Sequence, residues 1–300
     1  MKKIIGSLIG MTLLLGAYLG GCSSPNPSSP AANLTPTATK TITRTPTTTR
    51  SSTPTRTATP TRTITSTPTI TPTGTLSPTL SPTPSMTPTP QTGQAMVNLG
   101  TASNYAALAY SAITNSGAST LCGSLGLYPL TSVDGGIVIT CGGVTDVADG
   151  AANTAKLDLG TAYTDAAGRP GGAILAPGGD IGGLTFYPGL YTESSDLLIS
   201  SSDVTLDAQG NVNAVFIFQV NGNLVVGPGR QIILAGGTKA SHVFWQVTGY
   251  GALDTTVSFA GNIMAYTSVT LNTGAVLLGR ALAENGDVTL LGNSITIPAP

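Results

Sequence analysis

The sequence is short of the side chains on which most enzymes depend. Its 300 residues include one histidine and three cysteines, and only 8% of them are charged. His242 stands beside an apolar stretch, where a lone histidine is more often structural than catalytic. Because no second histidine and no Cys-X-X-Cys spacing accompany it, neither a nucleophilic triad nor a zinc site can be assembled convincingly. We therefore expect a protein without catalytic residues, metal or cofactor.

Basic residues are scarce in the C-terminal two thirds of the chain. From Met96 onward, five lysines and arginines stand against all 13 aspartates and glutamates. Binding to a phosphate backbone requires clustered basic side chains, so nucleic acid is excluded as a partner. Asp196, Asp203 and Asp207 are the one group comparable with the acid clusters of solenoid polysaccharide lyases. Turn-capping explains these aspartates better, and a lyase would have to lose its activity on Asp203→Ala.

The first 22 residues predict export and lipidation. Two lysines follow Met1 and precede an apolar stretch over residues 4–19, which is the arrangement of a secretory signal peptide and too short for a comfortable transmembrane helix. The tetrapeptide Leu-Gly-Gly-Cys that ends at Cys22 matches the lipobox pattern at all four positions. We expect a signal peptide over residues 1–21, a lipid on Cys22, and a mature protein that is anchored to the membrane of the cell envelope and faces outside. An ordinary cleaved signal and an uncleaved anchor are the alternatives.

Residues 22–95 are expected to form a disordered stalk. They are almost entirely threonine, proline, serine and small residues, with five basic residues and no acidic one. Such a segment cannot bury enough apolar surface to offset its ordering entropy. Its prolines favour extended polyproline II conformations of about 3.1 Å per residue, and its composition is typical of O-glycosylated stalks. The stalk would hold a folded domain away from the membrane.

Residues 96–300 are expected to form one domain that is mainly β. Roughly 200 residues suffice for a domain with its own core, and short alternating runs separated by glycine or asparagine dominate the segment. One stretch differs, because apolar residues from Val147 to Ala166 recur at spacings of four and three. This spacing predicts a helix over residues 144–168, capped by Thr145 or Asp146.

A weak internal repeat occupies the last ninety residues. Segments that begin at Asn213, Ser241, Gly261 and Gly279 can be aligned, and two Val-Thr-Leu triplets lie 19 residues apart. A period of 18 to 20 residues with three short strands predicts a β-solenoid of triangular cross-section, in which each coil stacks on the next. A β-sandwich with chance similarity between its strands is the alternative.

The strands of one coil differ in character. The strand represented by residues 214–219 and 243–247 is apolar on both sides, so its outer side needs a cover, which the predicted helix could supply. The two Val-Thr-Leu strands alternate instead, with valine and leucine inward and Ser268, Thr270 and Thr289 outward. Their outer side is therefore expected to be exposed to solvent and rich in small hydroxyl groups.

A flat face with rows of hydroxyl groups matches an ordered, repeating ligand. Coils stack about 4.8 Å apart and residues two apart in a strand are about 6.7 Å apart, which is near the oxygen repeats of ice. A threonine supplies a methyl group that lets water form a cage and a hydroxyl that anchors the cage. The alternative explanation is that threonine is simply a good residue for an exposed strand.

Cys122 and Cys141 remain once Cys22 is assigned to the lipid. In an exported domain such a pair predicts a disulfide, which would close a loop of roughly 20 residues and stabilise by about 3 kcal/mol on the chain-entropy estimate. Two free buried thiols are the alternative.

From Val97 to its end the chain resembles the widespread microbial ice-binding protein family with a discontinuous β-solenoid and a flanking α-helix. The stretches that carry the resemblance are VNLGTASNYAALA, AITNSG, GSLGLYP, LGTAYTDAAGRP, GGLTFYPGLY, DAQGNVNAVFIFQV, HVFWQV and TSVTLNTGAVLLGRALA. The resemblance implies a right-handed β-helix whose N-terminal first coil packs between later coils, a helix along one face, and a capping insertion near residues 127–144. That insertion carries Cys141, in agreement with a disulfide to Cys122.

The resemblance also implies a function, whereas the candidate binding residues are the expected outward positions on the face that carries Ser268 and Asp287, because members of the family differ in which residues bind. The chain is expected to be a monomeric antifreeze, recrystallisation-inhibiting or ice-adhesion protein that adsorbs to ice without a chemical step. The predicted ice-binding residues are Thr114, Ser200, Thr255, Ser268, Thr270 and Thr289. Val225 and Asp287 interrupt this hydroxyl row.

Two alternatives to this assignment remain open. The neighbouring face is a rival site, and its expected outward residues are Thr120, Thr205, Ser258, Thr296, Ile233 and Leu277. A cell-surface adhesin or glycan-binding solenoid is the rival function, because Tyr128, Tyr187 and Tyr250 are candidates for stacking on sugars.

Overall fold

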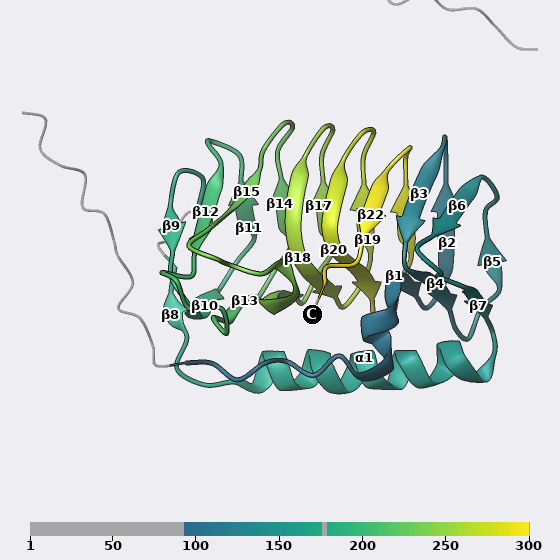
Figure 1. Cartoon of the computed structure of the whole chain (residues 1–300), viewed down its shortest axis with the longest axis horizontal. Helices are drawn as coiled ribbons and strands as arrows, with labels where there is room; N and C mark the ends of the chain where they lie inside the picture. Colours follow the sequence, from purple (N-terminus) through teal and green to yellow (C-terminus); the bar gives the residue numbers. More distant parts are fainter. Residues whose placement is uncertain (1–92, 176–178, 300) are drawn as a thin grey trace, which may run out of the picture. The chain divides into compact units, whose positions relative to one another are not determined.

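The computed structural model describes residues 93–175 and 179–299, so the predicted signal peptide, Cys22 and nearly all of the predicted stalk lie outside the described residues. The described part is mainly β, with parallel strands arranged in three sheets and one α-helix along one side (Figure 1). The chain visits the sheets in turn and then returns to the first one. Each circuit therefore adds new strands beside those of the previous circuit, as the sequence repeat predicts.

Sheet B is an uninterrupted set of parallel strands. In the described part it has seven strands, which are, in spatial order, β11 (Leu197–Ile199), β14 (Leu224–Val226), β17 (Gly251–Leu253), β19 (Val269–Leu271), β21 (Val288–Leu290), β2 (Ala112–Asn115) and β5 (Ser132–Val133). The two Val-Thr-Leu triplets are paired in register, with Val269 opposite Val288 and Thr270 opposite Thr289. The repeat seen in the sequence is thus a repeat of neighbouring strands.

Sheet A is the larger sheet, and it occupies two sides of the domain. Its helix-side strands are β8 (Ala173–Ile174), β10 (Gly189–Glu193), β13 (Phe216–Val220), β16 (Val243–Val247), β1 (Tyr105–Ala109), β4 (Ser124–Leu127) and β7 (Thr145–Val147). The long strands β18 (Ser258–Ala265) and β20 (Val276–Ala283) belong to both sides. They are paired at Gly261 and Gly279, and a Cβ atom on Gly279 would collide with the Gly261 carbonyl oxygen.

The remaining strands complete the third side of each circuit. They are β22 (Ser294–Thr296), β3 (Ser119–Cys122) and β6 (Ile137–Thr140) of sheet A, and β9 (Thr185–Phe186), β12 (Val204–Asp207) and β15 (Ile232–Ala235) of sheet C. An isolated bridge joins Gln231, which precedes β15 of sheet C, to Ser258 at the start of β18 of sheet A. This side is therefore discontinuous, in contrast to sheet B.

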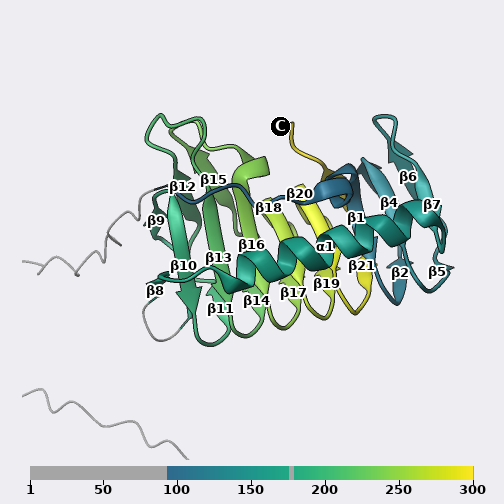
Figure 2. The ribbon, with the colours of Figure 1, turned by 90° about the horizontal axis from the view of Figure 1, so that it is seen from below.

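Helix α1 (Gly150–Gly168) covers the outer side of sheet A and runs across its strands (Figure 2). It begins later than the sequence predicts, because residues 145–147 pair with β4 as strand β7. Asp149, and not Thr145 or Asp146, is the N-cap, and its side chain accepts a hydrogen bond from the Ala152 amide at 2.8 Å. No helix among residues 93–175 and 179–299 is both long and apolar enough to cross a membrane.

Two apolar cores lie on either side of sheet A. The interior core is enclosed by the three sheets and contains a ladder of aromatic rings, in which Tyr191, Phe218 and Trp245 stack on successive strands. The second core lies between sheet A and α1, where Ile217 and Phe244 pack with Leu159 of the helix. The expectation that this strand is apolar on both sides and covered by the helix is confirmed.

The first circuit of the domain packs between later ones. Strand β2 lies between β21 and β5, β1 lies between β20 and β4, and β3 lies between β22 and β6. The resemblance implied this arrangement. The insertion near residues 127–144 supplies β5 and β6, which form the end of the stack.

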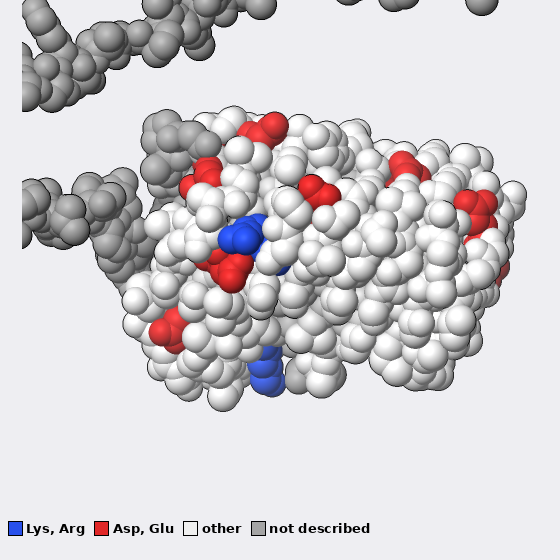
Figure 3. All heavy atoms as spheres, turned by 90° about the horizontal axis from the view of Figure 1, so that it is seen from above, with Lys and Arg blue, Asp and Glu red and all other residues white. Residues whose placement is uncertain are grey.

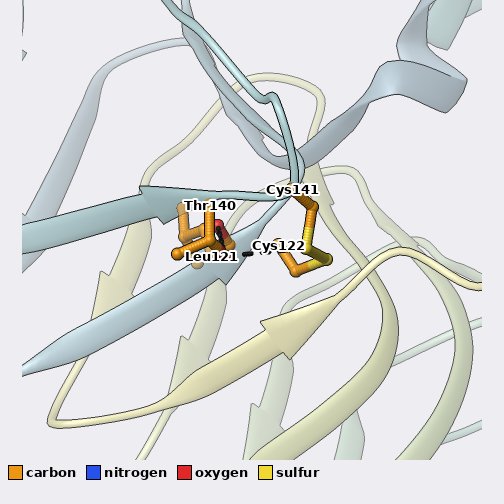
Figure 4. Close-up of a disulfide and its surroundings, with 4 residues drawn as sticks. All are labelled: Leu121, Cys122, Thr140 and Cys141. Atoms are coloured by element: carbon orange, nitrogen blue, oxygen red, sulfur yellow. Dashed lines mark hydrogen bonds between the residues drawn. A yellow bond between two sulfur atoms is a disulfide. The ribbon is translucent and has the colours of Figure 1, made fainter.

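A disulfide joins Cys122, at the end of β3, to Cys141, which follows β6 (Figure 4). Beside it, the Thr140 hydroxyl donates to the Leu121 carbonyl at 3.1 Å. The disulfide prediction is confirmed, and the bond ties the terminal circuit to its neighbour.

Candidate binding surface

The outer side of sheet B, called here the open face, carries one central row of side chains. In each strand the residues that point inward, such as Val269 and Val288, are fully buried. The residue between two inward residues of the same strand points outward and is half-buried. The row consists, in spatial order, of Leu198, Val225, Ala252, Thr270, Thr289 and Thr114. Because each member is paired in register with the next, the row follows the strand spacing of about 4.8 Å.

The row has a hydroxyl half, called here the threonine row, made of Thr270, Thr289 and Thr114. The hydroxyl groups of Thr114 and Thr289 are hydrogen-bonded to each other at 2.9 Å. The Thr289 hydroxyl also lies 2.8 Å from the Asp287 carboxylate, to which it donates. These bonds fix the hydroxyl groups of Thr114 and Thr289 on a regular backbone, so the methyl groups of these two residues are also held in place.

The other half of the row is apolar, with Leu198, Val225 and Ala252. The sequence prediction recognised Val225 as an interruption but missed Leu198 and Ala252. Both stand at the middle of a three-residue strand that aligns with Val-Thr-Leu, and that alignment was the signal that could have found them. No member of the whole row is charged.

The structure brings together some of the six predicted ice-binding residues and separates others. Thr114, Thr270 and Thr289 form the threonine row. Ser268 directly precedes β19 and is two residues before Thr270. It lies beside Asp287 of the next circuit. Ser200 and Thr255 lie in the turns that follow β11 and β17, outside the central row.

One of these turns is held by an aspartate. The Asp180 carboxylate accepts hydrogen bonds from the Ser200 hydroxyl at 2.7 Å and from the amides of Gly182, Ser200 and Ser201. Burial alone would raise the pKa of Asp180, but these hydrogen bonds outweigh it and lower the pKa to about 2. The Ser200 hydroxyl therefore stabilises a turn and is already engaged.

The rival face is less regular than the open face. Thr120 and Ser258 are exposed there, and Thr205 and Thr296 are half-buried. Leu277 was expected outward, but it is fully buried, because its register with Phe259 and Ile295 places it in the interior core. The outward positions of β20 are instead Val276 and Leu278, which are exposed together with Val138 and Ile233. This face is thus more apolar than expected as well as discontinuous.

The candidate catalytic groups are dispersed. His242 is buried, with its ring Nδ1 3.2 Å from the Ala214 carbonyl oxygen. Asp207 accepts from the Gln209 amide two residues further on, as expected of a turn-capping aspartate. Asp196 and Asp203 instead accept from the Asn223 and Gln231 amides of the next circuit. No group of three or more histidine, cysteine or acidic side chains in the described chain could hold a metal ion.

The candidate sugar-stacking tyrosines do not form one surface. Tyr250 is exposed before β17, whereas Tyr128 and Tyr187 are half-buried after β4 and before β10. Charged side chains are also few and scattered on the side of the domain opposite the helix (Figure 3). The open face is therefore the most regular surface that the described residues present.

The chain is similar to known ice-binding proteins in sequence and in structure. The family model described as ice-binding-like matches residues 107–296. An ice-binding protein of Colwellia sp. is 38% identical over 222 residues, covering 69% of this chain and 85% of the relative. An ice-binding protein of Flavobacterium frigoris is 38% identical over 225 residues, covering 69% of this chain and 79% of the relative.

A solved structure has the same fold. The crystal structure of an ice-binding protein from an Antarctic biological consortium superposes with a TM-score of 0.68 at 45% sequence identity, covering 70% of this chain and 96% of the other. With the family model, the relatives and the fold in agreement, the chain belongs to the ice-binding-like family.

Proposed function

We propose that this protein binds ice through the open face and so acts as an antifreeze, recrystallisation-inhibiting or ice-adhesion protein. Family membership supports ice as the ligand, since the relatives bear the name ice-binding protein. The observation that carries the choice of surface is the in-register threonine row on an uninterrupted sheet of seven described strands.

The physical match is one of spacing and rigidity. Strand stacking sets a repeat of about 4.8 Å along the row, and alternate residues along a strand set one of about 6.7 Å. An ordered lattice of water needs a surface whose groups do not move relative to one another. The parallel ladder and the hydrogen bond between Thr114 and Thr289 provide such a surface. Binding of this kind needs no chemical step, and we propose that the protein is not an enzyme.

The test is a steric block of the row. Thr270→Tyr should abolish recrystallisation inhibition and thermal hysteresis, because a large ring at the centre of the row keeps the face from meeting a flat lattice. Thr205→Tyr is the matched control, since Thr205 is also half-buried and in the middle of a strand, but on the rival face. Loss of activity in Thr205→Tyr alone would assign the site to the rival face. A wild-type protein with no effect on ice at high concentration would refute the proposed function.

We further propose that the circuits form a right-handed coil of triangular cross-section and that the domain is a monomer. Parallel strands of one sheet joined by crossovers are right-handed in about 98% of cases, and the grouping of the strands of successive circuits into helix-side strands, sheet B and the remaining strands supports three sides. A crystal structure with left-handed crossovers would contradict the first proposal. A dimer mass in light scattering would contradict the second.

The N-terminal sequence supports a tethered form of this function. We propose that the signal peptide is removed, that Cys22 carries a lipid, and that residues 22–95 hold the domain outside the envelope. Cells given an alkyne fatty acid should label the wild type and Cys122→Ala, but not Cys22→Ala. Label that persists in Cys22→Ala would disprove the anchor.

A further inference from the structure

Arg280 is a buried cation in an unusual place. It lies on the outer side of sheet A, in the row that runs from Ile217 through Phe244 and Asn262. At this point the cover is the N-terminal segment with the 3-10 helix η1 (Gly100–Asn104), because the Ser103 carbonyl oxygen accepts from Arg280 Nε at 2.8 Å. Only 7% of the residue is exposed.

The guanidinium group has neutral partners only. Besides Ser103, its Nη1 donates to Asn262 Oδ1 at 2.7 Å. The ion pairs found among residues 93–175 and 179–299 are Lys156–Glu284, Arg169–Asp165 and Arg230–Asp203, and none includes Arg280. In that part of the chain, Nη2 has no hydrogen-bond partner. Burial lowers the pKa of Arg280 to about 10, yet the group remains charged at neutral pH.

Ser241 is a second unsatisfied group at the same place. Its Oγ is buried without a hydrogen-bond partner in the described chain, and the residue is 8% exposed. Asn262 connects it to Arg280, because Asn262 Nδ2 donates to the Ser241 carbonyl at 3.2 Å while Oδ1 accepts from the guanidinium. A buried hydroxyl without a partner is costly, and within the described residues the guanidinium group beside it still has one nitrogen, Nη2, free to donate.

Arg280 and Ser241 line one pocket of about 490 Å³. It is bounded by the segment that leads into η1, by β16 and β20, and by the C-terminal residues after β22. Its apolar wall consists of Met96, Val97, Leu99, Phe244, Ile297 and Pro298. No acidic side chain lines it, so Arg280 is the one charge among the lining residues.

We propose that this pocket binds a small organic carboxylate with a short aliphatic body. The carboxylate would pair with Arg280 Nη2 and accept from Ser241 Oγ, since a guanidinium and a hydroxyl are complementary donors for it. The aliphatic part would lie against the apolar wall, which makes inorganic phosphate or sulfate a poorer match. The site is separate from the open face and does not depend on ice binding.

Titration calorimetry of the full chain with sodium hexanoate tests the proposal. Hexanoate should bind to the wild type, and hexan-1-ol, which has the same body without the charge, should bind at least about tenfold more weakly because it lacks the charge-assisted hydrogen bond. Arg280→Met should lose at least about tenfold in affinity and Ser241→Ala a few-fold. Arg230→Met removes an equal charge outside the pocket and should leave binding unchanged.

Three results would each overturn the proposal. They are equal affinity for the acid and the alcohol, unchanged hexanoate affinity in Arg280→Met, and no binding of hexanoate by the folded wild type at millimolar concentration. If Arg280→Met does not fold, as judged by circular dichroism, the acid–alcohol comparison in the wild type and the Ser241→Ala affinity decide the question.

Discussion

The helix-covered side of sheet A and the open face of sheet B are built by the same circuits of the same chain, yet they face different surroundings. Both have apolar residues on their inner side. On the outer side, sheet A presents large apolar residues such as Phe244, Met264 and Leu282, all buried by the cover. Sheet B presents small and half-buried residues that include the threonine row. The outer residues of each sheet therefore match its surroundings, large and apolar beneath the cover and small and half-buried where the face is open.

This difference predicts that truncating an outward side chain to alanine lowers the free energy of unfolding by different amounts on the two sheets. Phe244→Ala should lower the free energy of unfolding by about 3–5 kcal/mol, because it leaves a cavity beneath α1. Val225→Ala, at the corresponding outward position of sheet B, should cost about 1 kcal/mol or less, since the side chain is only half-buried. Urea unfolding measures both, and similar losses would show that the two sides do not differ as described.

The end of the stack offers a second contrast. Helix α1 contacts β7, while β6 lies on the rival face and is tied to β3 by the Cys122–Cys141 disulfide. Cys141→Ser should lower the free energy of unfolding by about 2–4 kcal/mol. The wild type under reducing conditions should lose a similar amount. No change in the urea midpoint would mean that the disulfide does not stabilise the packing of β6 on β3.

A buried lysine makes the helix cover sensitive to pH. Lys156 Nζ donates to the carbonyl oxygens of Ala283 and Glu284 at 2.7 Å, and burial lowers its pKa from 10.5 to about 8 although Glu284 opposes this. Between these two values the unfolded chain binds more protons than the folded one, so the free energy of unfolding rises with pH. The rise should be on the order of 2 kcal/mol from pH 8 to 10.

Lys156→Met is the control for this rise. The other titrating groups are the same in both proteins, so their effects cancel when the change in the free energy of unfolding of Lys156→Met is subtracted from that of the wild type. Unfolding by urea at several pH values compares the two proteins. If the wild type and Lys156→Met change by the same amount between pH 8 and 10, Lys156 is not the cause.

The smallest expected effect on stability concerns a substitution on the open face. Ala252→Thr should change the free energy of unfolding by no more than about 0.5 kcal/mol, but it would extend the threonine row by one member and raise thermal hysteresis. Ala252→Val adds the same volume without the hydroxyl. If Ala252→Val raises thermal hysteresis equally, shape and not the hydroxyl group is responsible.

Much of the architecture followed from local sequence pattern. The Val-Thr-Leu spacing identified strands that are neighbours in space, and the doubly apolar strands required the helix cover that the structure has. The start of the helix was wrong because Thr145 and Asp146 have good capping chemistry, but their backbone pairs with β4. A tertiary contact outweighed a local preference there.

The binding surface was predictable only in part. Thr114 is 175 residues away from Thr289 in sequence, and its place came from the family resemblance and not from any period. Leu277 was misplaced because β20 continues through a corner at Gly279. The in-and-out alternation of side chains along one strand does not show which residues point into the core on each side of such a corner. The Arg280 pocket had no local signal, since three distant segments form it.

The place of the first circuit also bears on when the protein folds. Strands β1, β2 and β3 are synthesised first, but one neighbour of each, β20, β21 or β22, comes at the end of the chain. Until those last strands exist, several strand edges remain without partners, and such distant pairings are slow to form. Closure must therefore follow the synthesis of β20, β21 and β22. An export route that threads unfolded chains would receive this domain while it is still open.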